Sequence, residues 1–168
     1  VPLYLKECLG ATAFWASQAL AVLQAGAIFG RIGWGIASDR LFRGRRKTTL
    51  IIIGLLGALL SGMLSLMTRE TPVYVLLVVI FFSGLCLVGY QGVSFALIGE
   101  LAGTTRAGVA TGIMLSINSA AAALGTPLFG YFVDRTGSYL YAWQILAAAI
   151  AFAVLGFAFF LNESRPVL

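Results

Sequence analysis

The chain alternates between long apolar stretches and short charged ones. Its uncharged stretches cover residues 8–30, 48–68, 71–99, 107–133 and 136–162. A helix needs about 20 mostly apolar residues to cross a bilayer, and backbone polar groups inside lipid must be satisfied within their own segment. We therefore predict five transmembrane helices, at residues 16–38, 48–68, 72–98, 107–132 and 141–161.

The composition supports a membrane protein and excludes most other classes. Hydrophobic residues make up 60% of the 168 residues, only 10% are charged, and the mean hydropathy is +0.98. Because a soluble domain carries about 25% charged residues, a water-soluble enzyme, a disordered chain and a disulfide scaffold are excluded. The predicted fold is all-α, a polytopic membrane helical bundle that forms a single membrane domain over residues 1–168.

Basic residues are concentrated in one loop, which predicts the orientation of the chain. Five of the eleven Lys and Arg residues lie within residues 40–47, between the first two predicted helices. Cytoplasmic loops are enriched in Lys and Arg, and placing this loop inside puts seven basic residues on the cytoplasmic side against three outside. We therefore predict a multi-pass protein of the inner or plasma membrane, with residues 40–47 and the C-terminus cytoplasmic, and no nucleic-acid partner.

The chain lacks the side chains that many catalytic and metal sites need. It has no histidine, and its two cysteines, Cys8 and Cys86, are far apart. Neither a Ser-His-Asp arrangement nor a cysteine–histidine metal site can be formed, so we predict no enzyme activity, no metal site and no cofactor. The chain starts with Val1 and its first methionine is Met63, so we expect a fragment whose preceding segment is missing.

The first predicted helix carries a polar stripe. Ser17, Gln24, Arg31 and Ser38 recur every seven residues and therefore share one helical face. Arg31 lies about 12 Å inward from Asp39, and an arginine at such depth costs at least roughly 2.5–3.5 kcal/mol unless it meets water, a partner or an anion. We expect Arg31 to face an aqueous cavity and attract an anionic substrate, because a guanidinium stays protonated and offers paired donors to a carboxylate. Snorkelling to the lipid headgroups and a structural ion pair are the alternatives.

Other polar residues inside the apolar stretches are candidates to line the same cavity. Tyr90 and Gln91 lie between Gly89 and Gly92 in the third predicted helix, and Asn118 lies in the fourth. Hydrogen bonding between helices is the alternative role for such side chains. The predicted substrate-binding residues are Gln24, Arg31, Tyr90, Gln91 and Asn118.

Small residues at four-residue spacing predict close contacts between helices. Gly26 and Gly30 have this spacing in the first predicted helix, and Gly108 and Gly112 have it in the fourth. Because glycines let two backbones approach without large side chains between them, we expect both helices to pack tightly against neighbours.

The loop between the first two predicted helices resembles a known signature. Residues 35–40 read Gly-x3-Asp-Arg and residues 44–47 read Gly-Arg-Arg-Lys, which is similar to the signature loop of the major facilitator superfamily, although two additional residues lengthen it. Residues 99–108 and 125–139 also resemble segments of that family. The resemblance covers essentially the whole chain, as helices eight to twelve plus the tail of helix seven.

The resemblance implies half of a twelve-helix major-facilitator fold, in a secondary active transporter that exposes a substrate bound between its halves to each side in turn. The missing N-terminal half would then be a partner of this chain. The gating-loop residues that it implies are Gly35, Asp39, Arg40, Gly44, Arg45 and Arg46. For the basic residues among them, a role in orientation alone is the alternative.

Our functional hypothesis is a symporter or antiporter that moves a small solute across the lipid bilayer. An organic anion is the leading substrate class, and this choice rests on Arg31. A drug-efflux transporter of the same superfamily and a non-transporting five-helix membrane scaffold or subunit are the alternatives.

Overall fold

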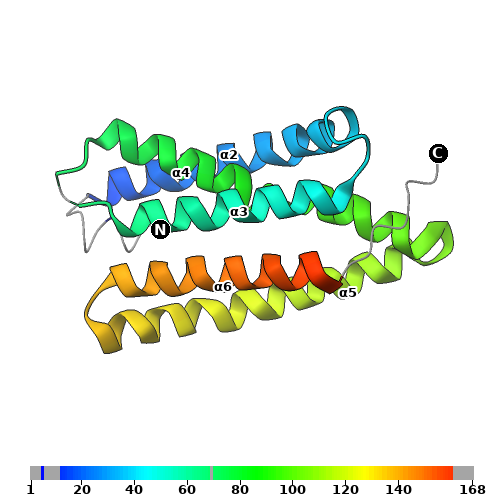
Figure 1. The fold of residues 1–168 in the computed structure, drawn as a ribbon. Helices are drawn as coiled ribbons and strands as arrows, with labels where there is room; N and C mark the ends of the chain where they lie inside the picture. The colour runs from blue at the N-terminus through cyan, green and yellow to red at the C-terminus, as the bar shows by residue number, and fades with distance from the viewer. Residues whose placement is uncertain (1–4, 6–11, 69, 161–168) are drawn as a thin grey trace.

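The computed structural model describes Leu5, residues 12–68 and residues 70–160. Within these ranges the chain is helical and contains no strand (Figure 1). The helices are α2 (Ala13–Arg40), α3 (Arg46–Ser65), α4 (Val73–Leu87), α5 (Gln91–Thr136) and α6 (Tyr139–Phe160). Four segments of this part are long and apolar enough to cross a membrane, at Phe14–Arg40, Arg46–Ser65, Val73–Thr136 and Tyr139–Phe159. The prediction of an all-α membrane helical bundle is confirmed.

The start and end of α2 follow from local chemistry. The Trp15 amide donates a hydrogen bond to the hydroxyl of Thr12 at 3.5 Å, so that Thr12 caps the helix. After α2, the chain turns through Arg43 and Gly44, whose φ angles are 52° and 75°. A glycine adopts such an angle without a Cβ clash. The predicted helix 16–38 lies inside α2, and the basic loop is a tight turn between α2 and α3.

The helix α3 ends earlier than hydropathy predicts. The apolar stretch predicts a helix to residue 68, but α3 stops at Ser65. In the turn that follows, the Thr68 amide donates to the Thr71 hydroxyl at 3.1 Å, and the Thr71 amide donates to the Thr68 carbonyl at 3.0 Å. Pro72 then precedes α4. Hydrogen bonding in the turn, rather than hydropathy, therefore sets this boundary.

The predicted helix 72–98 is interrupted in its middle. Residues 88–90 separate α4 from α5, and the Gly89 amide donates to the carbonyl of Gly84, five residues back, at 3.0 Å. Such a widened turn is a π-type bulge. The bulge lies against α2, since a Cβ on Gly89 would be 2.8 Å from the Gly30 Cα atom.

The helix α5 consists of two parts that meet at Gly103. This residue has φ 70° and ψ 171°, which is not helical. The first part continues from α4, and the second part turns back to run beside α6 (Figure 1). The predicted helix 107–132 lies in the second part. The predicted helix 141–161 overlaps α6, apart from residue 161, which lies outside the described residues.

The tightest contact in the bundle joins α2 to α4, and glycines form it. A Cβ on Gly84 would overlap the carbonyl oxygen of Leu23, and a Cβ on Gly26 or Gly30 would overlap a carbonyl oxygen of α4. The two backbones therefore touch, as the spacing of Gly26 and Gly30 predicts. We call this contact the α2–α4 seam.

The second part of α5 is largely exposed. Residues 119–128 are all exposed, and a Cβ on Gly108 or Gly112 would meet no neighbour within 4 Å. The part does contact α6 near its end, where the Phe129 and Trp143 ring centroids are 5.4 Å apart. The close packing predicted at Gly108 and Gly112 is thus absent within the described residues, because no described helix lies against that face.

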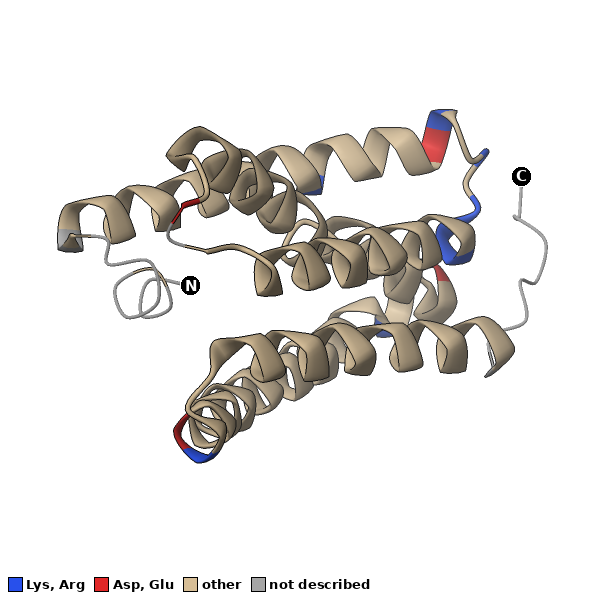
Figure 2. Cartoon of the chain, turned by 60° about the vertical axis from the view of Figure 1, so that its left-hand side comes forward, with Lys and Arg blue, Asp and Glu red and all other residues tan. Residues whose placement is uncertain are grey.

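Charged residues lie mainly at the ends of the helices (Figure 2). The long middle sections of the bundle are apolar, with Arg31 as the exception in α2. The largest core cluster joins α2, α3, α4 and α6, and includes Leu64, Ile80 and Trp143. This distribution is the one expected for helices that cross a hydrocarbon layer and end in water.

Candidate functional site

Arg31 pairs with Gln91 on the surface of the bundle. The Arg31 Nη2 atom donates a hydrogen bond to the Gln91 Oε1 atom at 2.9 Å. The contact joins the middle of α2 to the first residue of α5, and the backbones are close there, since a Cβ on Gly92 would be 2.6 Å from the Arg31 carbonyl oxygen. The bulge after α4 thus positions Gln91 beside Arg31.

The Arg31 guanidinium remains available to a ligand. Arg31 is exposed, and within residues 12–68 and 70–160 no carboxylate forms an ion pair with it. A guanidinium has five N–H donors, so the bond to Gln91 leaves others for an anion. Gln24, two helical turns earlier on the same face, is exposed as well. This face of α2 therefore presents hydrogen-bonding groups at the depth where the surrounding side chains are apolar.

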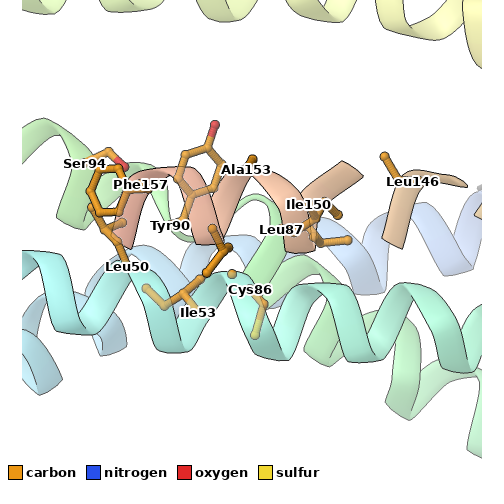
Figure 3. A pocket seen from close by; sticks show the side chains of 12 residues that line it. Leu50, Ile53, Cys86, Leu87, Tyr90, Ser94, Leu146, Ile150, Ala153 and Phe157 are labelled. Carbon is orange, nitrogen blue, oxygen red and sulfur yellow. The ribbon is translucent and has the colours of Figure 1, made fainter. Parts of the chain in front are cut away.

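Tyr90 lies apart from this pair although it is next to Gln91 in sequence. Tyr90 and Ser94 line a cavity of about 580 Å³ that Leu50, Ile53 and other apolar side chains of α3, α4 and α6 complete (Figure 3). Consecutive residues of a helix point in directions about 100° apart, and the bulge precedes both residues. The structure therefore brings Arg31 and Gln91 together and places Tyr90 in a separate, mostly apolar cavity.

Asn118 lies in the second part of α5. Its Nδ2 atom is buried and has no hydrogen-bond partner among the described residues. A buried amide N–H without a partner is unfavourable by about 1–3 kcal/mol. Asn118 is thus a group that a ligand or a further helix would satisfy.

At the basic end of the bundle, Arg46 joins two carboxylates from different helices. Its Nη1 atom lies 2.6 Å from the Asp39 Oδ1 atom, and its Nη2 and Nε atoms lie 3.0 and 3.1 Å from the Glu100 Oε1 atom. The Arg46 side chain is only 14% exposed, whereas the two carboxylates are 59% and 55% exposed. We call this set the Arg46 bridge. It ties the end of α2 and the start of α3 to the first part of α5.

The rest of the basic loop is ordered by its backbone and two hydroxyl groups. The Gly44 amide donates to the Ser38 carbonyl at 2.9 Å, and the buried Thr49 hydroxyl donates to the Ser38 hydroxyl at 3.2 Å. Arg40 and Arg45 are exposed. Gly35 is half-buried, and a Cβ there would meet nothing within 4 Å, so local packing does not require a glycine.

A role for Glu100 was not predicted from the sequence. Glu100 lies in the segment 99–108, which was noted only for its resemblance, and its partner is Arg46, 54 residues away. The one signal was an acidic residue at the end of an apolar stretch on the same predicted side as the basic loop. Within the described residues, no group of three or more His, Cys, Asp or Glu could hold a metal ion.

Comparison with protein families gives a match over the whole chain. Residues 1–168 match the family model described as Major Facilitator Superfamily. A search of curated proteins gives no match.

Proposed function

Because the chain belongs to the major facilitator superfamily, whose members are membrane transporters rather than enzymes, we propose that it is part of a secondary transporter that moves a small organic anion. In this proposal the chain supplies helices eight to twelve, a preceding half supplies the other side of the substrate path, and alternating access exposes the substrate to each side. The multi-pass chain lies with residues 40–47 on the cytoplasmic side of the cell membrane.

The observation that carries the anion proposal is the Arg31–Gln91 pair. Arg31 is exposed within an apolar helix, forms no ion pair with the described residues and keeps free donors beside the Gln91 amide. A charge placed there is unfavourable unless a polar environment compensates it. An anionic substrate would compensate it directly through charge-assisted hydrogen bonds.

Gln24 and Asn118 are proposed as further contacts to the substrate. Gln24 is exposed on the face of α2 that carries Arg31, and the Asn118 amide has an unused N–H donor within the described part. Tyr90 is retained in the proposed set because it adjoins Gln91, although it lines the apolar cavity. Polar groups of this kind fix the orientation of a ligand in a mostly apolar site.

The gating proposal rests on the Arg46 bridge. One guanidinium holds two carboxylates from α2 and α5 at the basic end, and a change in the relative position of these helices would break at least one contact. Asp39 and Arg46 are proposed to stabilise one state of the transporter in this way. Gly44 shapes the turn, while Gly35, Arg40 and Arg45 are proposed to contact the preceding half of the transporter.

Transport by the intact protein tests the proposed function. The transporter that contains this chain would be reconstituted in vesicles and offered small organic anions, neutral solutes and organic cations in parallel. We expect saturable uptake of anions that exceeds the uptake of the other two classes. Uptake restricted to hydrophobic cations would favour drug efflux, and the absence of all uptake would favour a scaffold.

Asp39→Asn should lower transport about fivefold without changing membrane insertion. The substitution removes one charge from the Arg46 bridge, and an exposed ion pair contributes up to about 1 kcal/mol, which corresponds to about a fivefold change in an equilibrium. Initial uptake rates and the amount of protein in the membrane should be measured together. Asp134→Asn, an exposed carboxylate at the end of α5, is the matched control and should transport normally. Wild-type uptake by Asp39→Asn would contradict the gating role.

A further inference from the structure

The cavity beside Tyr90 extends along α6, and we call it the slot. Its lining on α6 extends from Leu146 to Phe157, which is about 16 Å along the helix axis. Figure 3 shows Leu50, Ser94 and Phe157 at one end of the lining and Leu146 at the other. One leaflet of a bilayer contributes half of a hydrocarbon layer of about 30 Å, so the slot has the length of one acyl chain.

The lining of the slot suits hydrocarbon. Its polar groups are few, with Tyr90, Ser94 and Cys86 among side chains that are otherwise apolar. The slot reaches from the surface to the core, because Ala153 is exposed while Ile53 is only 2% exposed. An apolar occupant would cover surface that water would otherwise contact, which is favourable in proportion to the area covered.

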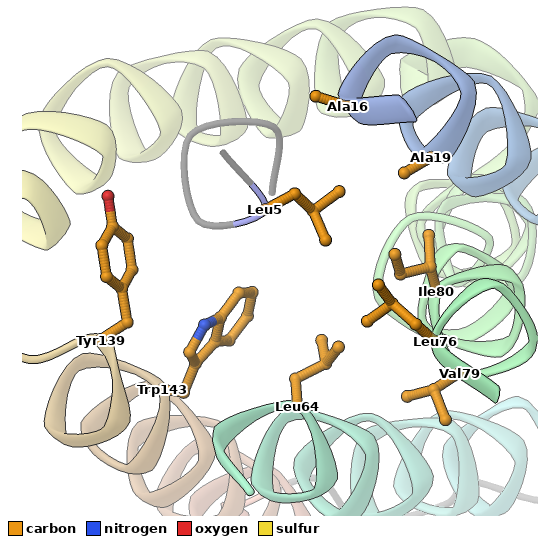
Figure 4. Packing of buried hydrophobic residues seen from close by; sticks show 9 residues of the cluster. All are labelled: Leu5, Ala16, Ala19, Leu64, Leu76, Val79, Ile80, Tyr139 and Trp143. Atoms are coloured by element: carbon orange, nitrogen blue, oxygen red, sulfur yellow. The ribbon is translucent and has the colours of Figure 1, made fainter. Parts of the chain in front are cut away.

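The two ends of the slot differ. At the Leu146 end, the slot meets the core cluster, since Leu146 packs against the cluster that contains Leu64 and Trp143 (Figure 4). At the other end, Leu50 follows Arg46 and Lys47 by about one helical turn, and these two residues belong to the basic stretch 43–47. The slot therefore meets the packed core at one end and lies about one helical turn from basic residues at the other.

We propose that the slot binds one acyl chain of an anionic phospholipid, whose phosphate group lies at the basic start of α3. A phospholipid combines a hydrocarbon chain of this length with a negative charge at one end, and the slot combines an apolar lining with a basic mouth. Basic side chains beside a membrane surface attract anionic headgroups. This site does not include the Arg31–Gln91 pair and shares only Tyr90 with the proposed substrate contacts, so the inference goes beyond the proposed transport function.

Photo-crosslinking with a lipid tracer tests this proposal on the whole chain in vesicles. The tracer is phosphatidylglycerol with a diazirine in its acyl chain, added in trace amount to phosphatidylcholine vesicles, and labelled residues are identified by mass spectrometry. Ile53 reports on the slot because it is buried, and Leu59, which is 61% exposed on the same helix, reports on bulk lipid. We expect labelling of Ile53 in the wild-type chain. Ile53 without label while Leu59 is labelled would overturn the proposal.

A variant in which a larger side chain fills the slot gives a second test of the proposal. Ala153→Trp places an indole in the slot and should lower the ratio of Ile53 to Leu59 labelling at least fivefold. Ala149→Trp is the control, because Ala149 is also exposed on α6 but does not line the slot. Circular dichroism and Leu59 labelling would establish that both variants are folded and inserted. An equal ratio in the two variants would overturn the proposal.

Competition in the wild-type chain needs no variant. Unlabelled phosphatidylglycerol should lower the Ile53 to Leu59 ratio at least threefold, because the slot saturates and bulk lipid does not. The same amount of additional phosphatidylcholine should leave the ratio unchanged. Equal competition by the two lipids, or none by either, would overturn the assignment of an anionic phospholipid.

Discussion

Arg31→Ala should lower the kcat/KM for anion uptake about 100-fold in the intact transporter. The substitution removes the guanidinium that Gln91 positions at 2.9 Å. A hydrogen bond to a charged group contributes about 1.5–3 kcal/mol, and 100-fold corresponds to about 2.7 kcal/mol. Initial rates of uptake over a range of anion concentrations, normalised to the amount of inserted protein, would measure the effect.

Two further variants separate a role in binding from a role in folding. Arg31→Lys keeps the charge but loses the paired donors, so it should retain part of the activity. Arg135→Ala removes an arginine that donates a hydrogen bond to the Tyr131 hydroxyl near the end of α5, away from the Arg31–Gln91 pair. This variant should transport anions normally. If Arg31→Ala showed unchanged uptake kinetics, Arg31 would not belong to the substrate site.

Gly84→Ala should destabilise the bundle by about 3 kcal/mol or more. The new Cβ would overlap the backbone carbonyl oxygen of Leu23 across the α2–α4 seam, and neither backbone can move aside without separating the two helices. Overpacking of a tight contact costs typically about 1–3 kcal/mol and occasionally more, and here a main-chain atom rather than a flexible side chain is displaced. A titration with sodium dodecyl sulfate, followed by circular dichroism, would show a lower midpoint.

Gly62→Ala is the matched control for this experiment. Gly62 also lies inside a helix, but a Cβ there would meet nothing within 4 Å. Alanine favours a helix over glycine by about 1 kcal/mol, so this variant should be as stable as the wild type or slightly more stable. Equal midpoints for Gly84→Ala and the wild type would mean that the seam is looser than the structure indicates.

The positions of the helices could be predicted because charge is excluded from their middles. The ends of the helices could not be predicted in this way, because local hydrogen bonds determine where each helix stops. Thr68 and Thr71 close a turn inside an apolar stretch, and Gly89 widens a helix where α2 touches it. Hydropathy predicts which residues are buried away from water, but it does not predict which helices will pack against each other.

The candidate site was predicted residue by residue but not as pairs. A seven-residue spacing is enough to single out Arg31 in the sequence, whereas its bond to Gln91 depends on how closely α2 approaches α5. The same limitation applies to Glu100, whose bond to Arg46 spans 54 residues. Local spacing determines which side chains share a face, and only the packing of whole helices determines which faces meet.

The α2–α4 seam also constrains how a transport cycle could work. Main-chain atoms of the two helices are in contact at Gly26, Gly30 and Gly84. These helices can therefore rotate only together, as one rigid body. Arg31 lies on α2, and Gln91 is the first residue of α5, where the backbone still touches α2 beside Gly92. The pair would therefore keep its mutual geometry throughout the rotation. Any difference in substrate affinity between the inward-facing and outward-facing states would then originate in residues outside this pair.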